Sequence, residues 1–137
     1  MNTLSIGSDP ALKATFHSRR YGSDGWLDSY AMDLEAIDFR ASVRVQNPGY
    51  GHPPTQLFNE MAADWKGWSG KKSWNALDGE LEMEATADSI GHVTLRLTIP
   101  GYESSQLWSA QGRLLVEAGQ LERLAQDAEH FFARRDA

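Results

Sequence analysis

The chain has 137 residues, a formal net charge of −6 at pH 7 and no cysteine. This length fits a single domain, and the absence of cysteine excludes disulfides, cysteine-based zinc sites and a cysteine nucleophile. The negative charge argues against nucleic acid as a partner, and no stretch approaches the roughly 18 apolar residues of a membrane-spanning helix.

The start of the chain is polar and carries no basic segment followed by an apolar run. Residues 1–10 are therefore not expected to be a signal peptide, and we expect them to form a poorly ordered lead-in. One domain should follow over residues 11–137. Because a chain without cysteine suits a reducing compartment, we expect the protein in the cytoplasm.

Apolar and polar residues alternate in the first half, which predicts strands because successive side chains on a strand point to opposite faces. A tight turn at Glu35–Ala36 would place Leu34 opposite Ile37 on the apolar face of a hairpin. The expected strands cover residues 12–17, 26–34 and 37–45.

A helix is expected next, because apolar residues recur at helical spacing from Leu57 to Trp68. Gly70 marks its end, as glycine commonly does after a helix. Residues 71–76 then form a linker to the second half of the chain.

The second half repeats this order with strands over 81–87, 93–99 and 108–116, and with Trp108 facing inward on the last of them. A three-residue loop at Ser89–Gly91 fits the first hairpin, and its register places Glu84 opposite Arg96 on the polar face. A final helix carries its apolar face on Leu121, Leu124, Ala125, Ala128 and Phe131 or Phe132.

Each expected strand has one apolar and one polar face, whereas a sheet covered on both sides would show continuous apolar runs. We therefore expect an α+β fold in which six strands form one antiparallel sheet with both helices on one face. The chain would be a doubled βββα unit, with pseudo-repeats over residues 11–70 and 79–134. The opposite face of the sheet would be open to water.

Several segments resemble a family of small bacterial proteins of unknown function, and they are similar to immunity proteins of the WapI type. The segments are Asp24-Gly25-Trp26-Leu27, Leu57 to Gly70, Gly79-Glu80-Leu81-Glu82-Met83, Gly91-His92-Val93 and Leu114 to Phe132. The resemblance implies the doubled βββα arrangement and a role in neutralising a toxin.

The sequence carries no recognisable catalytic motif. There is no G-x-S-x-G elbow, and no phosphate loop or pair of histidines at the spacing of a helical zinc site. Glu80, Glu82 and Glu84 share one side of a strand with His92 and could hold a hard cation. A solvated strand of alternating charge explains the same pattern better, because metal sites usually draw on loops or several elements. We therefore expect no metal, no cofactor and no catalytic residue.

These observations favour a non-enzymatic domain that binds another protein, and its sharpest version is an immunity protein that binds a bacterial toxin domain. The acidic charge and the broad polar sheet face fit this hypothesis. The expected contact residues are Glu80, Glu82, Glu84, Arg96 and Trp74.

Two alternatives remain open. The first is a small-ligand site or enzyme pocket between the sheet and the loop 47–54, lined by Asp28, Tyr50 and His52. The second is a homo-oligomeric scaffold joined through a sheet edge.

Overall fold

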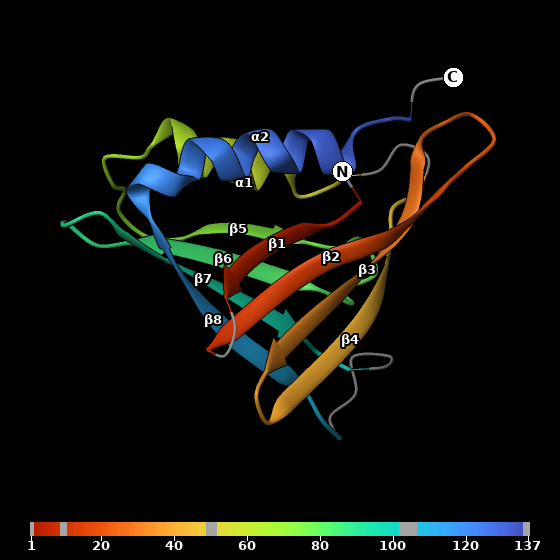
Figure 1. Ribbon diagram of the computed structural model, residues 1–137, viewed down its shortest axis with the longest axis horizontal. Helices are drawn as coiled ribbons and strands as arrows, with labels where there is room; N and C mark the ends of the chain where they lie inside the picture. The colour runs from red at the N-terminus through yellow and green to blue at the C-terminus, as the bar shows by residue number, and fades with distance from the viewer. Residues whose placement is uncertain (1, 9–10, 49–51, 102–106, 136–137) are drawn as a thin grey trace.

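We describe the protein from a computed structural model that places residues 2–8, 11–48, 52–101 and 107–135. These segments form two antiparallel sheets of four strands, and each sheet is followed in the chain by one helix (Figure 1). The first sheet has the order β1 (Leu4–Ser8), β2 (Leu12–Tyr21), β3 (Leu27–Ala36) and β4 (Phe39–Gln46). The second has the order β5 (Lys72–Asn75), β6 (Glu82–Ala87), β7 (His92–Ile99) and β8 (Ala110–Glu117). The helices are α1 (Thr55–Ala63), the short 3₁₀ helix η2 (Ala118–Gln120) and α2 (Leu121–Phe132).

The expected single sheet of six strands is wrong, although the α+β class is confirmed. Strands with one apolar face are compatible with a sheet under helices and also with two sheets packed face to face. The alternation reports that one side of each strand is buried, but it does not report what covers that side. The repeating unit is therefore ββββα and not βββα.

The strand missing from each expected half is short and has few inward apolar residues. Strand β1 lies within the expected lead-in and, over residues 4–7, buries only Leu4 and Ile6. Strand β5 lies within the expected linker and buries only Trp74. Helix α1 also ends earlier than expected, at Ala63 and not near Trp68.

The two sheets and the two helices enclose one apolar core. The helices lie side by side along one side of the molecule, where they close the space between the splayed sheets (Figure 1). Each helix also reaches the other half of the chain, because α1 contacts β5 and α2 contacts β1. On another side β2 meets β8, where a Cβ added to Gly112 would lie 2.7 Å from the Cδ2 atom of Leu12. None of the described helices is long and apolar enough to span a membrane.

The two expected hairpins have different outcomes. Strands β6 and β7 pair with Glu84 opposite Arg96, as predicted, and Gly91 adopts a φ of 92° in the loop between them. Strands β3 and β4 instead pair Ala36 with Phe39, so Ile37 is at the tip of the turn and 86% exposed. The observed register pairs Leu34 with Ala41 and not with Ile37, a shift of four residues. A shift by an even number of residues keeps every side chain on the same face, so the apolar pattern does not distinguish the two alignments.

The turn between β2 and β3 holds the segment that follows α2. The main-chain N–H of Arg135 donates to the carbonyl oxygen of Gly25 at 2.8 Å, and Arg134 donates two side-chain hydrogen bonds to the carbonyl oxygen of Asp24. The guanidinium of Arg134 also lies 5.3 Å from the centre of the Trp26 ring. The Asp-Gly-Trp segment therefore has a structural role, because it ties the two ends of the fold together.

We expect Gly25→Ala to lower the free energy of unfolding by more than Gly79→Ala. Both glycines have positive φ, at 85° and 75°, so a side chain strains each backbone by about 1–2 kcal/mol. A Cβ at Gly25 would also lie 3.0 Å from the carbonyl oxygen of Arg135, whereas a Cβ at Gly79 would have no atom within 4 Å. Urea unfolding of both variants measures the difference, and equal losses would contradict the role of this contact.

Candidate functional site

The outer face of the second sheet presents three rows of side chains, and none of them is buried. Cross-strand pairing aligns residues of all four strands, because directly opposite residues in antiparallel pairs share a face. The rows are Asn75, Glu82, Thr98 and Gln111; then Ser73, Glu84, Arg96 and Arg113; then Thr86, Thr94 and Leu115.

A polar hollow of about 380 Å³ lies on this outer face. At its centre, the Nζ atom of Lys71 donates to Glu84 at 2.9 Å, and Nη1 of Arg96 lies 3.8 Å from the same carboxylate. The hydrogen bond from Lys71 and its charge, helped by Arg96, lower the pKa of Glu84 below its usual value. The hollow is lined by Lys71, Ser73, Asn75, Glu82, Glu84, Arg96, Thr98 and Gln111.

Three of the five contact residues expected from the sequence therefore meet in one place. Glu82, Glu84 and Arg96 line the hollow together. The alternation of β6 and β7 made this arrangement predictable, because it fixed both the shared face and the register. Lys71 was missed, because it lies in the segment that was expected to be a linker.

Two further residues of this face were not predicted as contacts. Arg113 stands directly opposite Arg96, and among the described residues no carboxylate forms an ion pair with it. Leu115, two residues further along β8, is 75% exposed. A signal for Leu115 was present in the sequence, because the run Leu114-Leu115-Val116 places an apolar residue at an outward position.

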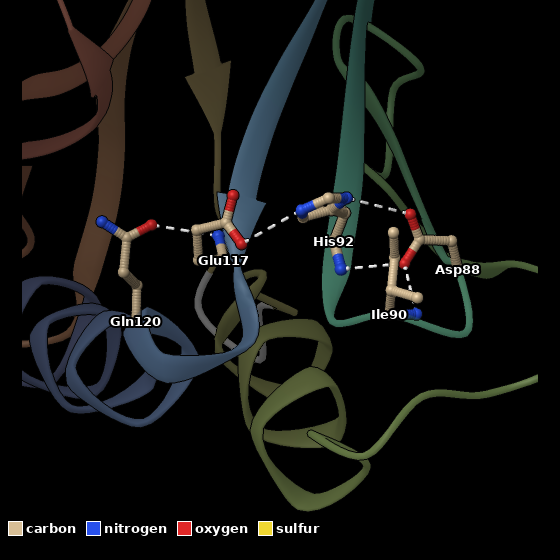
Figure 2. A network of polar contacts seen from close by, with 5 residues as sticks. All are labelled: Asp88, Ile90, His92, Glu117 and Gln120. Atoms are coloured by element: carbon tan, nitrogen blue, oxygen red, sulfur yellow. Dashed lines mark hydrogen bonds and ion pairs between the residues drawn. The ribbon is translucent and has the colours of Figure 1, made fainter.

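A polar network borders this face where β7 and β8 meet the helices (Figure 2). The imidazole of His92 lies between two carboxylates, with Nδ1 3.1 Å from Asp88 and Nε2 3.5 Å from Glu117. Asp88 also accepts the main-chain N–H groups of His92 and Ile90, both at 2.9 Å, and these bonds lower its pKa. Gln120 accepts the main-chain N–H of Glu117. The network therefore stabilises the β6–β7 loop and connects it, through the end of β8, to the helix η2.

The cation site that was weighed above for Glu80, Glu82, Glu84 and His92 is not found among the described residues. Glu84 is paired with Lys71, and His92 is engaged by Asp88 and Glu117. Within the described ranges of the chain, no group of three or more histidine, aspartate and glutamate side chains is arranged to hold a metal ion.

Trp74 and Glu80 lie away from the outer face. Trp74 is 5% exposed, and its indole N–H donates to the carbonyl oxygen of His52 at 2.8 Å. The expectation that its ring contacts a partner is therefore wrong, because β5 turns this side chain inward opposite Met83. Glu80 precedes β6 and accepts the main-chain N–H of Gln46 from the first sheet at 3.3 Å.

The alternative pocket at the loop 47–54 gains no support from the described part of the chain. Tyr50 lies outside the described residues. Asp28 is exposed on β3, and the ring of His52 stacks on Trp74 with 6.5 Å between the ring centres. No hydrogen bond or ion pair joins Asp28 to His52.

A second polar group lies on the outer face of the first sheet. Nε2 of His17 is 3.0 Å from a carboxylate oxygen of Asp33, and Nδ1 is 2.8 Å from the hydroxyl oxygen of Ser18. Ser18 has a φ of 54° at an irregularity between β2 and β3, and its carbonyl oxygen accepts from Arg44. These contacts hold the irregular strand in place, which is a structural role.

Comparisons with known proteins place this fold in a family. No curated protein matches the chain. A family model described as a family of unknown function, DUF6228, matches residues 6–135, which run from within β1 to beyond the end of α2. The chain therefore belongs to the DUF6228 family of unknown function.

Proposed function

We propose that this protein is a non-enzymatic domain that binds another protein through the outer face of its second sheet. The observation that carries the proposal is the exposure of Arg113, which stands opposite Arg96 of the hollow, and of Leu115 on the same strand. Arginine is enriched among the residues that dominate binding energy. Covering one leucine side chain contributes about 1.5–3 kcal/mol.

The hollow would supply specificity more than affinity. Lys71 and Arg96 already neutralise Glu84, so a partner gains little from pairing with that carboxylate. Charges at the edge of an interface mainly set the orientation and the rate of association. Arg113 differs, because it lies beside another arginine and a partner carboxylate would relieve that repulsion.

The sharpest version of the proposal is an immunity-type protein that neutralises a bacterial toxin domain. It rests on the sequence resemblance described above, and the open polar face is compatible with it. A toxin gene beside the gene of this protein would support this version. The absence of such a toxin among neighbours would count against it, but not against protein binding itself.

The test is capture of a partner from a lysate of the source organism, followed by titration of the purified partner. We expect Arg113→Glu and Leu115→Glu each to weaken binding by about tenfold or more. Arg20→Glu is the matched control, because Arg20 is exposed on β2 of the first sheet and not on the second sheet. Equal binding by all three variants would refute the proposed surface.

A further inference from the structure

Strand β4 is a free edge of the first sheet (Figure 1). The main-chain hydrogen bonds at the end of β4 show which of its N–H groups point away from β3. The N–H of Asn47 donates to Asp28 on β3 at 2.8 Å, whereas the N–H of Gln46 donates away from β3 to Glu80. Because adjacent residues of a strand direct their main-chain groups to opposite sides, Ser42 and Arg44 also direct theirs away from β3.

This edge forms one wall of a groove of about 570 Å³. Ser42, Val43, Arg44 and Gln46 line the first wall. The second wall comes from the second sheet and its loops, namely Asp78, Gly79, Glu80, Ile99, Gly101 and Trp108. Trp108 was expected to face inward, but it precedes β8 and is 51% exposed.

The groove has an apolar and an acidic part. Val43, Ile99 and Trp108 supply the apolar surface, and Asp78 and Glu80 supply two carboxylates near the Gln46 end. The carboxylate of Asp78 is exposed and that of Glu80 is partly exposed, and both line the groove. Their negative charge favours a cationic side chain from a bound partner.

We propose that this groove binds an extended segment of a partner protein, which pairs with β4 and places a lysine or arginine side chain at Glu80. Main-chain hydrogen bonds to Ser42 and Arg44 would supply affinity, and the apolar wall would select one inward side chain, as in other cases of strand addition. A second copy of the chain paired edge to edge is the competing occupant, and the solution mass distinguishes it from a partner segment. This site is on the opposite side of β4 from β3 and is separate from the outer face of the second sheet.

Hydrogen exchange of the free protein gives the first test. We expect the amides of Ser42 and Arg44 to exchange fast and those of Val43 and Val45 to exchange slowly, because only the latter pair with β3. Slow exchange at Ser42 and Arg44 would mean that the edge is already covered, and it would overturn the proposal. A doubled solution mass together with that slow exchange would identify edge-to-edge dimerisation as the reason.

Selection from a displayed library of random eight-residue peptides gives the second test. We expect enriched peptides to alternate apolar and polar residues and to contain a lysine or arginine. Resynthesised peptides should bind Trp108→Ala and Glu80→Gln about tenfold more weakly than the unmodified protein. Trp65→Ala is the matched control, because Trp65 is 55% exposed and outside the groove.

Methylating alternate peptide nitrogens separates strand addition from other modes of binding, because it removes main-chain donors and leaves the side chains. The peptide that is methylated in one of the two alternating patterns should bind the protein about tenfold more weakly, or worse. The proposal would be overturned if no peptide is enriched. It would also be overturned if peptide binding is unchanged by both the methylation and Trp108→Ala. Leu115→Glu should leave peptide binding unchanged, so this test is independent of the proposed function.

Discussion

Replacing Phe131 with alanine is expected to lower the free energy of unfolding by about 3–5 kcal/mol. Phe131 is fully buried on α2, and its ring lies 6.4 Å from both Phe16 and Tyr30 of the first sheet and 5.0 Å from Phe132. The helix therefore fills the core of a sheet from the other half of the chain. Removing the ring would leave a cavity that the packed strands β2 and β3 close only in part.

Phe39→Ala is the matched control, because this phenylalanine is 38% exposed at the turn between β3 and β4. We expect a loss of about 1 kcal/mol or less from that variant, since much of its ring is already in water. Urea unfolding followed by circular dichroism measures both values. Similar losses in the two variants would contradict the packing of α2 against the first sheet.

Acid is expected to destabilise the protein in part through Asp33. Burial by itself would raise the pKa of this carboxyl group, but hydrogen bonds from Ser42 and His17 and the charges of His17 and Arg40 outweigh it. The pKa therefore lies below its usual value. The side chain of Asp33 is 11% exposed, so solvent screens these contacts only weakly.

A lowered pKa means that the folded state favours the carboxylate more than the unfolded state does. The resulting stability is fully present above the unfolded pKa of about 3.9, and it is lost as the pH falls through the lower folded pKa. We expect Asp33→Asn to lower the free energy of unfolding at pH 7 by about 1.5–3 kcal/mol, because hydrogen bonds to a charged acceptor are lost. Below pH 4 the difference from the unmodified protein should shrink.

Unfolding midpoints in urea between pH 7 and pH 2 check this expectation. Asp38→Asn is the control, because Asp38 is exposed at the neighbouring turn. The variant at Asp33 should keep some acid sensitivity, since Glu84 and Asp88 also have lowered pKa values. Parallel pH curves for the protein and its Asp33→Asn variant would show that this carboxyl group does not contribute.

The candidate surface was only partly predictable from the sequence. Strong alternation and a glycine-containing loop fixed the hairpin of β6 and β7, so Glu84 and Arg96 were correctly placed opposite each other. Predicting that Trp74 points inward would have required recognising β5, a strand of four residues with one buried side chain. Trp108 was misplaced because β8 begins after it, at Ala110.

The six longer strands, the buried face of α2 and the α+β class were determined by the sequence itself, because periodicity is a local property of the chain. The short strands β1 and β5 were not recognised from it. The division into two sheets was decided only by tertiary structure. Pairing partners and the cover of each apolar face depend on contacts between distant residues, such as Leu12 with Gly112 and Phe131 with Phe16. The groove beside β4 exists for the same reason, since one of its walls comes from each sheet.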